Sequence, residues 1–322
     1  MDLDELEKIL GMQRADIRIV PTGIGGGFGS KLDISIQPYL AIAALKTGKP
    51  VRITYSRTES MQSTTKRHPA EMSVKIGASK NGKLTGMVFD GLFNTGAYAS
   101  WGPTVSNRVP VHASGPYVLE NYRAEAKGIH TNGPPSGAFR GFGVPQAAIA
   151  QESLFDELAD KLGMDRLEFR LLNVLENNDE TVCGQVFAQG VGSRACFEGL
   201  RPAWQTERKA AEVYNSKSKI LRRGVGIAGG WYGCGNTSLP NPSTIKSGIR
   251  QDGTIVLHQG AMDIGQGANT AIAQIFATCL DVPVHQLELV GPDTDITPDA
   301  GKTSASRQTF VSGNAARLSA QA

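Results

Sequence analysis

Apolar residues recur at the three- and four-residue spacing of an amphipathic helix in five parts of the chain. Around Phe155, for example, Leu158 and Leu162 follow on the same face, which predicts a helix that packs on a core. At the N-terminus, Asp2 can cap the first helix and Gly11 can end it. The five predicted helices span residues 2–10, 33–47, 146–162, 165–177 and 269–280.

Other segments alternate between apolar and polar residues, a pattern typical of half-buried strands. The pairs Asn81-Gly82 and Asp252-Gly253 lie between such runs and predict two β-hairpins. Short β-prone runs at residues 17–20 and 225–228 predict further strands. The mixture of strands and helices predicts an α/β fold, or mixed α+β, and no internal sequence repeat is evident.

A charged segment interrupts this pattern in the second half of the chain. It spans residues 205–223, is poor in large apolar residues, and predicts a solvated helix followed by a linker. At 322 residues the chain is long enough for roughly two domains. We therefore expect a first subdomain at residues 1–205, a helix and linker at 206–223, and a second subdomain at 224–322.

Glycine-rich or hydroxyl-rich loops are distributed along the whole chain. Glycine makes up 38 of 322 residues, about 12%, against an average of about 7%. Because glycine permits close backbone approach and positive φ, several such loops favour one large polar ligand. The five loops read Gly25-Gly-Gly-Phe-Gly-Ser-Lys31, Gly137-Ala-Phe-Arg-Gly-Phe-Gly143, Gly229-Gly-Trp-Tyr-Gly233, Asp263-Ile-Gly-Gln-Gly-Ala-Asn269 and Thr303-Ser-Ala-Ser-Arg-Gln-Thr309.

The first of these loops lies between the predicted strand at 17–20 and the predicted helix at 33–47, an order that favours an anion site at a helix N-terminus. The dinucleotide pattern G-x-G-x-x-G is not met, because the sixth residue is Phe28 counted from Gly23 and Ser30 counted from Gly25. The nucleotide P-loop pattern is not met either. The alternative is that each loop is a tight turn between packed elements.

Bulk composition narrows the class of protein. The net charge of +3 is dispersed, which gives no support for nucleic-acid binding, and no run of 18 apolar residues predicts a membrane span. The N-terminus is acidic and unlike a signal peptide. The four cysteines form no C-x-x-C pair, so the chain offers no zinc or iron–sulfur pattern of its own. We expect a cytoplasmic protein with reduced cysteines.

Taken in order, the loops resemble those of the molybdenum-cofactor (large) subunit of the xanthine dehydrogenase and aldehyde oxidase family. The matching stretches are 25–31, 138–143, 265–267 and 297–313, so the likeness covers essentially the whole chain. It implies a molybdopterin-binding fold of two elongated mixed subdomains with the cofactor between them. It also implies that the pterin dithiolene, and no side chain, holds the molybdenum.

The resemblance implies a role for each matching position. Gln266 matches a glutamine that hydrogen-bonds a molybdenum ligand, and is the one catalytic residue expected in this chain. Gly29, with Phe28 beside it, matches the residue whose N–H meets an oxo ligand. Arg140 and its neighbours match pterin-binding positions, and Ser306 matches a residue that holds the pterin or its phosphate. The expected cofactor-binding set is Gly27, Phe28, Gly29, Ala138, Phe139, Arg140, Gly265, Gln266, Gly267, Ala305, Ser306, Gln308 and Thr309.

Three further residues are expected to contact the substrate. Phe142 matches a pocket phenylalanine that orients a flat substrate through ring contacts. Arg108 lies 32 residues before Arg140, at the position of an oxo-binding arginine, although a structural ion pair is an equal alternative. Leu32 stands where purine oxidisers carry a glutamate, which disfavours xanthine and favours a less polar ring.

The implied activity is that of a molybdenum hydroxylase, an oxidoreductase that oxidises an aromatic N-heterocycle or aldehyde and takes oxygen from water. Electrons would pass to [2Fe-2S] and FAD on an iron–sulfur subunit and a FAD subunit. The cofactor expected is molybdopterin with molybdenum, in its cytosine dinucleotide form. Nucleic acid and membrane are not expected partners.

Segments of the family that carry a further glutamine and the catalytic base are not found in this sequence, which contains no Gly-Glu dipeptide. The expectation is a central fragment or a split subunit, with the base and the remaining segments on another chain. Two alternatives stay open. One is a relative that reduces an aromatic acyl-CoA thioester, and the other is an inactive structural fragment without cofactor.

Overall fold

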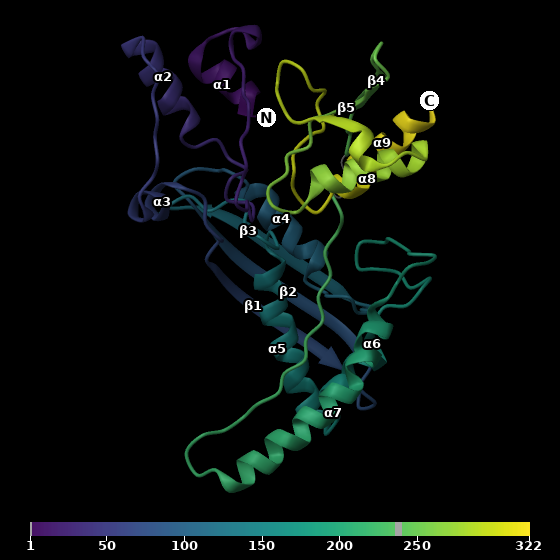
Figure 1. Ribbon diagram of the computed structural model, residues 1–322. Helices are drawn as coiled ribbons and strands as arrows, with labels where there is room; N and C mark the ends of the chain where they lie inside the picture. Colours follow the sequence, from purple (N-terminus) through teal and green to yellow (C-terminus); the bar gives the residue numbers. More distant parts are fainter. Residues whose placement is uncertain (1, 236–239) are drawn as a thin grey trace. The chain divides into compact units, whose positions relative to one another are not determined.

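The computed structural model describes residues 2–235 and 240–322 (Figure 1). The chain forms two compact units, and each is built from separate stretches of sequence. Unit 1 comprises Met1–Lys66, Ala138–Arg140 and Gly233–Ala322. Unit 2 comprises Arg67–Gly137 and Gly141–Tyr232. No helix in the described part of the chain is both long enough and apolar enough to cross a membrane.

Unit 2 contains a three-stranded sheet in the order β1-β2-β3. β1 (Ala70–Ala78) and β2 (Leu84–Gly96) form the antiparallel hairpin predicted at Asn81-Gly82, where Gly82 takes φ +87°. β3 (Tyr122–His130) lies parallel to β2 and is reached through α4 (Gly102–His112). α5 (Val144–Leu162), α6 (Arg166–Asn173) and α7 (Ser193–Lys217) complete the unit.

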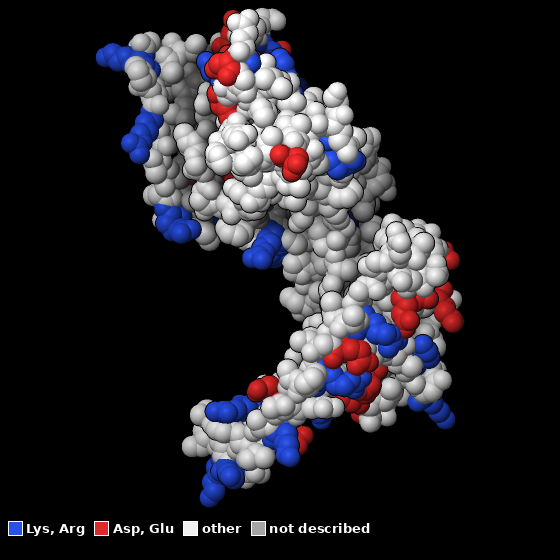
Figure 2. All heavy atoms as spheres, turned by 45° about the vertical axis from the view of Figure 1, so that its right-hand side comes forward, with Lys and Arg blue, Asp and Glu red and all other residues white. Residues whose placement is uncertain are grey.

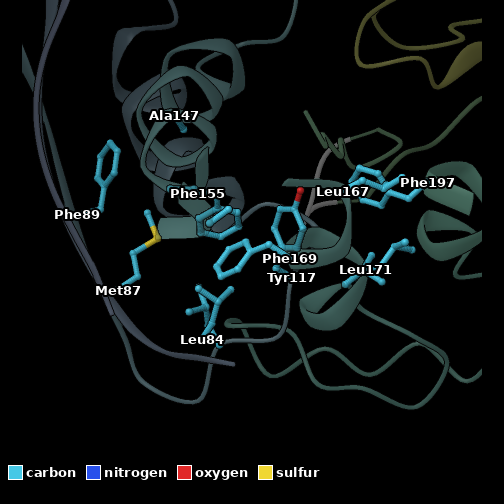
Figure 3. Close-up of a cluster of buried hydrophobic side chains, with 14 of the residues drawn as sticks. Leu84, Met87, Phe89, Tyr117, Ala147, Phe155, Leu167, Phe169, Leu171 and Phe197 are labelled. Atoms are coloured by element: carbon cyan, nitrogen blue, oxygen red, sulfur yellow. The ribbon is translucent and has the colours of Figure 1, made fainter. Parts of the chain in front are cut away.

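The core of unit 2 lies between the sheet and α5. Alternate residues of β2, including Phe89 and Phe93, are buried, as the two-residue period of a strand requires. Phe155 of α5 packs edge-on against Tyr117 and Phe169, with ring centroids 4.8 and 5.5 Å apart (Figure 3). Each buried aromatic ring contributes about 2–3 kcal/mol through removal from water.

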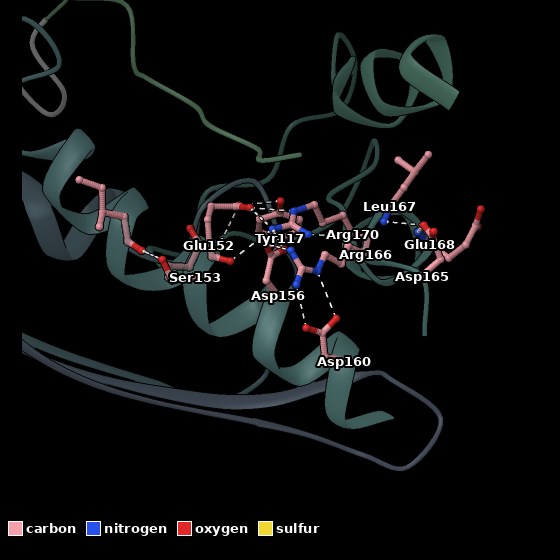
Figure 4. A network of polar contacts seen from close by, with 12 residues as sticks. Tyr117, Glu152, Ser153, Asp156, Asp160, Asp165, Arg166, Leu167, Glu168 and Arg170 are labelled. Carbon is pink, nitrogen blue, oxygen red and sulfur yellow. Dashed lines mark hydrogen bonds and ion pairs between the residues drawn. The ribbon is translucent and has the colours of Figure 1, made fainter. Parts of the chain in front are cut away.

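A buried ionic network joins α5 to α6 (Figure 4). The guanidinium of Arg170 is fully buried and contacts Glu152 at 2.6 Å and Asp156 at 2.8 Å. The Tyr117 hydroxyl donates to Glu152 at 2.8 Å, and Gln151 donates to the same carboxylate oxygen at 2.9 Å. Every charge in the network therefore has a partner, which is the condition for burying it.

Unit 1 contains a second three-stranded sheet, in the order β4-β5-β6. β4 (Ile245–Ile249) and β5 (Ile255–Gln259) form the hairpin predicted at Asp252-Gly253, and β6 (Leu287–Val290) lies parallel to β5. α8 (Ala268–Leu280) and α9 (Gln308–Gln321) pack side by side over a core that includes Leu257, Ile272 and Phe276 (Figure 1). The remaining helices of the unit are α1 (Asp2–Leu10), α2 (Gln37–Thr47) and α3 (Arg57–Ser63), with single 3₁₀ turns at Arg14–Asp16 and Val284–Gln286.

The two units repeat one topology that the sequence pattern does not reveal. Each has a hairpin, a helix that connects to a parallel third strand, and a second helix that follows: β1-β2-α4-β3-α5 in unit 2 and β4-β5-α8-β6-α9 in unit 1. In both, a loop runs directly into each of the two helices. The glycine-rich and hydroxyl-rich loops occupy three of these four positions.

Most predicted helices are confirmed, but two predicted strands are wrong. Residues 17–20 and 225–228 are extended without pairing into a sheet, since β-prone residues make a strand only where a partner edge exists. α2 begins only at Gln37, so the first glycine loop does not lead directly into a helix. α6 ends at Asn173, because Val174 returns to extended backbone with φ −65° and ψ 143°.

The charged segment predicted at 205–223 begins on α7 and continues beyond its last residue, Lys217. Arg201 pairs with Glu198 and Glu168, and Arg208 pairs with Asp165, so basic and acidic side chains alternate on this surface (Figure 2). α7 is a solvated helix over most of its second half. The subdomain boundaries at residues 205 and 224 stay a prediction.

Candidate cofactor-binding site

Two of the predicted loops lie against each other in unit 1, although more than 100 residues separate them in sequence. The backbone N–H of Arg140 donates to the carbonyl oxygen of Phe28 at 2.8 Å. At Gly29, an added β-carbon would lie 2.9 Å from the carbonyl carbon of Ala138 and 3.0 Å from the backbone nitrogen of Phe139. Gly29 is therefore required by the close approach of the second loop.

The loop at 263–269 contacts the first loop at Gly26 and Gly27. A β-carbon on Gly27 would lie 3.0 Å from the side chain of Ile264, and one on Gly265 would lie 3.7 Å from the backbone nitrogen of Gly26. The hydroxyl of Thr303 donates to the carbonyl of Met262 at 3.0 Å, which connects the loop at 303–309 to the same group. Segments of four of the five predicted loops thus converge in unit 1.

The fifth loop, at 229–233, lies mostly in unit 2, which includes its first four residues. Gly229 belongs to unit 2, where a β-carbon would lie 2.5 Å from the Tyr117 hydroxyl and 2.9 Å from the Phe197 ring. Its glycine is needed for packing on the core. For this loop, the alternative of a tight turn between packed elements fits the contacts.

Left-handed backbone at residues other than glycine is concentrated in the same loops. Phe28 has φ 52°, Phe142 has φ 47°, and Ala305 and Ser306 have φ 51° and 54°. Each such residue costs of order 1–3 kcal/mol, and such strain is commonly found at functional sites. This conformation could not be predicted from residue type, because none of these four residues is a glycine or asparagine.

Three of the loops lead directly into helix N-termini. The residues at the N-caps of α5, α8 and α9 are Gly143, Gly267 and Arg307, and none of the three makes a side-chain capping bond among the described residues. At α8 the carboxylate of Asp263 already accepts from the N–H groups of Gly267 and Asn269, so this terminus is capped from within the chain. At α5 and α9 the terminal N–H groups and the positive end of the helix dipole favour an anionic ligand. These two termini, rather than the first loop, therefore meet the requirements of the predicted anion site.

The side chain of Gln266 folds back on its own loop. Its Nε2 donates to the carbonyl of Met262 at 3.1 Å, and its Oε1 accepts from the N–H of Ile264 at 2.7 Å. Because an amide has two donor hydrogens and two acceptor lone pairs, one of each remains for a ligand. The side chain is exposed, so a ligand can reach it.

Asp263 organises the turn that presents Gln266. Its carboxylate accepts from the N–H groups of Gly265 at 2.9 Å, Gly267 at 3.3 Å and Asn269 at 3.1 Å. Burial opposes the charge of Asp263, but these three donors outweigh that effect and hold its pKa below the usual value. Sequence reasoning had not assigned a role to this residue.

The predicted residues at 305–309 divide into two kinds. Gln308 is buried, and its Nε2 lies 3.2 Å from both the Lys302 carbonyl and the Thr303 hydroxyl while its Oε1 accepts from Ser312. Its amide therefore shapes the loop. Ser306 and Thr309, by contrast, lie on an open groove of about 470 Å³ beside α9 and remain accessible.

Of the predicted substrate residues, two belong to unit 2. Phe142 meets Trp101 edge-on, with ring centroids 6.3 Å apart. Arg108 is only 7% exposed and stacks over the Tyr232 ring at 4.8 Å. Trp101 was missed because it follows a polar turn and carries no periodic signal.

The Tyr232 ring also stacks on His112, at 5.6 Å between centroids. Burial lowers the pKa of His112, and the neighbouring charge of Arg108 adds to that effect while a hydrogen bond to the Arg108 carbonyl opposes it. Leu32, the third predicted residue, lies in unit 1, where its N–H donates to the Gly29 carbonyl at 3.1 Å. Its contact with substrate stays a prediction.

The groups present fit a large polar, anionic cofactor. No acceptor for the N–H groups of Ala305 and Ser306 exists within residues 2–235 and 240–322, and the α9 N-terminus follows them. Space for a ligand exists beside Gly25 and Gly267, where a β-carbon would meet no heavy atom within 4 Å. Within the same ranges no cluster of three His, Cys, Asp or Glu side chains could hold a metal ion.

Comparison with known proteins identifies the family to which these loops belong. A family described as molybdopterin cofactor-binding domain matches residues 3–174, and a second family with the same description matches residues 200–322. The nicotinate dehydrogenase large molybdopterin subunit of Eubacterium barkeri is 43% identical over 212 residues, which is 66% of this chain and 48% of that protein. The xanthine dehydrogenase molybdenum-binding subunit of Escherichia coli O157:H7 is 36% identical over 94% of this chain and 41% of its own length.

Solved structures show the same fold. The aldehyde oxidoreductase of Desulfovibrio gigas matches with a TM-score of 0.91 and 33% identity, over 99% of this chain and 35% of that one. The chain thus spans less than half the length of these relatives, and the mixed helix-and-strand fold expected from the sequence is confirmed. The chain belongs to the family of molybdopterin cofactor-binding domains found in the molybdenum-binding subunits of xanthine dehydrogenases and aldehyde oxidoreductases.

Proposed function

We propose that this chain is the molybdopterin-binding part of an oxidoreductase that oxidises an aromatic N-heterocycle or an aldehyde. The observation that carries the proposal is the convergence of four loops in unit 1 around left-handed backbone and the N-terminus of α9, whose N-cap residue makes no side-chain capping bond among the described residues. Relatives named for nicotinate, xanthine and aldehydes support the reaction class.

The cofactor, when bound, supplies the two-electron chemistry, with water as the source of oxygen. This chain holds and orients it. Gln266 donates its remaining amide hydrogen to a molybdenum ligand, and Gly29 presents its backbone N–H with Phe28 beside it. The N–H groups of Ala305 and Ser306 and the hydroxyl of Thr309 hold the phosphate. Arg140, which is exposed at the end of the second loop, contacts the pterin.

Substrate contacts come from Phe142 and Arg108. Phe142 contacts a flat ring by its edge or face, and Trp101 sets the direction of the phenylalanine ring. Arg108 presents a buried charge to a carbonyl or carboxylate, held in place by Tyr232. Leu32 provides an apolar wall, which favours a ring that is less polar than xanthine.

We further propose the cytosine dinucleotide form of molybdopterin, a cytoplasmic location, and partner chains that carry [2Fe-2S] and FAD. A further chain segment would supply the catalytic base. The length of the relatives supports this last point, because they extend well beyond the matched region.

The decisive experiment is to tag the chain in its own cells, purify it gently with any bound partners, and measure molybdenum and pterin per chain. A ratio near one supports the proposal, and a ratio near zero in molybdenum-replete cells contradicts it and favours an inactive fragment. The same complex is then assayed with nicotinate-like heterocycles, aldehydes and xanthine. Activity only as a thioester reductase would contradict the hydroxylase assignment.

A further inference from the structure

The turn at Ser304–Ser306 is held rigidly in a form that exposes backbone N–H groups. The N–H of Gly235 donates to the Ala305 carbonyl at 2.8 Å, and the N–H of Arg307 donates to the Ser304 carbonyl at 3.2 Å. Ala305 and Ser306 are both left-handed, and their own N–H groups have no acceptor in the described residues. Protein contacts therefore hold the carbonyl groups of this turn, including that of Ser306, which accepts from the Cys234 thiol at 3.4 Å, while its two N–H groups remain for a ligand.

Directly after this turn stands Arg307, which is only 2% exposed although it carries a full positive charge. Its Nη1 donates to the carbonyls of Ala300 at 2.8 Å and Lys302 at 3.0 Å, and its Nη2 donates to the Pro242 carbonyl at 2.5 Å. Its Nε is buried without a partner among the residues that the structure describes. Gly301 makes room for it, since a β-carbon there would lie 2.9 Å from Nη1.

The contacts of Arg307 provide hydrogen bonds but no opposite charge. Every acceptor is a neutral carbonyl, and no carboxylate within residues 2–235 and 240–322 lies within 4.0 Å of the guanidinium. Burial lowers the pKa of Arg307, and Asp299, which is exposed, offsets this only through space. A buried charge is normally neutralised by a counter-ion, so the missing anion is expected nearby.

We propose that Arg307 is a positioning residue whose buried positive charge draws a phosphate group to the Ala305–Ser306 turn at the N-terminus of α9. The inference rests on the proposed function, in which that phosphate belongs to the pterin. The free N–H groups give the phosphate oxygens their hydrogen bonds, the helix dipole adds to the attraction, and Arg307 supplies the net charge from behind. Because three carbonyls hold the guanidinium in place, Arg307 does not contact the phosphate directly in place of the N–H groups.

The test uses the tagged chain with its partners and four forms of the protein. Arg307→Gln removes the charge, and Arg307→Lys keeps the charge but lacks the planar fork of donors that contacts the three carbonyls. Arg250→Gln is the matched control, because Arg250 belongs to the same unit but is exposed and does not line the groove beside Ser306. Pterin per chain is measured on each complex, and complexes from cells unable to make the pterin are titrated with inorganic phosphate.

If the charge is what matters, Arg307→Gln weakens phosphate binding about tenfold and lowers pterin content. Arg307→Lys then stays within about threefold of the wild type, and Arg250→Gln is unchanged. Equal, large losses in Arg307→Lys and Arg307→Gln would overturn the inference, because they indicate a structural role only. If circular dichroism shows that Arg307→Gln does not fold, Arg307→Lys is compared with the wild type instead. Phosphate affinity within about threefold of the wild type supports the inference, and a larger loss overturns it.

The two measurements separate this inference from the proposed function. A wild-type complex without pterin contradicts the proposed function, while the phosphate titration still tests the turn. A wild-type complex that carries pterin, with an Arg307→Gln variant that binds phosphate equally well, overturns the inference alone. Pterin loss without any change in phosphate affinity also overturns it.

Discussion

Gly29 lies so close to Ala138 that a β-carbon on Gly29 would come within 2.9 Å of both the carbonyl carbon and the carbonyl oxygen of Ala138. Gly29 also has φ +93°, which side chains rarely tolerate. Gly29→Ala should therefore separate the first and second loops, lower stability by about 2 kcal/mol or more, and reduce pterin per chain several-fold. Urea unfolding and pterin analysis measure the two effects. Gly25→Ala is the control, because a β-carbon there meets nothing within 4 Å, and equal effects in both variants would contradict the explanation.

Gln266 provides a second prediction, on catalysis. If its free amide hydrogen serves a molybdenum ligand, Gln266→Ala in the assembled complex should lower turnover by about 10²-fold, by analogy with the loss of a preorganised donor. Because its amide also holds Ile264 and Met262, pterin content must be measured beside kcat. Unchanged turnover would remove the proposed role, and a parallel loss of pterin would make Gln266 structural.

Phe142 is expected to act on substrate orientation rather than on cofactor retention. Phe142→Ala should lower kcat/KM for a heterocycle while molybdenum per chain stays constant. Trp101→Leu should produce a smaller change in the same direction, since the ring contact at 6.3 Å fixes the phenylalanine only indirectly. Loss of molybdenum in either variant would show that the rings support the fold instead.

His68 makes the stability of the protein dependent on pH. Its ring is 3% exposed, its Nε2 lies 3.1 Å from the Thr95 hydroxyl, and burial lowers its pKa to about 4 from the usual 6.5. The unfolded chain therefore binds the proton more tightly, so the free energy of unfolding should fall by up to about 3 kcal/mol as pH drops from 6.5 to 4. Urea titrations across this range should show the loss, and it should shrink in His68→Gln. His285→Gln, at an exposed position, should leave the slope unchanged, and equal slopes in all three forms would refute the assignment.

Glu152 tests the buried ionic network. Glu152→Gln leaves the fully buried Arg170 without its nearest full charge and should cost about 3–5 kcal/mol in unfolding free energy. The comparison is Glu157→Gln, which removes one exposed partner of Lys161 on the same helix and should cost less than about 1 kcal/mol. Similar values for the two would indicate that the network is solvated.

How far the sequence predicted this molecule depends on the kind of signal. Strong periodicity located α5 and α8 to within two residues, and Asn81-Gly82 and Asp252-Gly253 located both hairpins. α4 and α9 were missed, because α4 carries Pro110 and small polar residues, and α9 has no clear apolar stripe. Their existence depends on packing that a local pattern does not contain.

For the site, the loops themselves were predictable but their conformation was not. Glycines marked where the backbone had to turn, yet the left-handed residues Phe28, Ala305 and Ser306 resemble ordinary residues in the sequence. In the sequence, Arg307 does not differ from the other polar residues of its hydroxyl-rich loop. Its burial, which only the structure shows, distinguishes it from exposed residues such as Ser306. Distance in sequence hid the contact between Gly29 and Ala138, which only the fold provides.

The way unit 1 is assembled has a consequence for biosynthesis. Its first 66 residues leave the ribosome early, but the strands and helices on which they depend come from Gly233–Ala322. Unit 2, formed from Arg67–Gly137 and Gly141–Tyr232, is almost continuous and can fold first. The N-terminal segment, with its glycine loop, can complete its contacts only after Gly233–Ala322 has been made. Ligand loading at the converged loops must therefore follow synthesis of that segment.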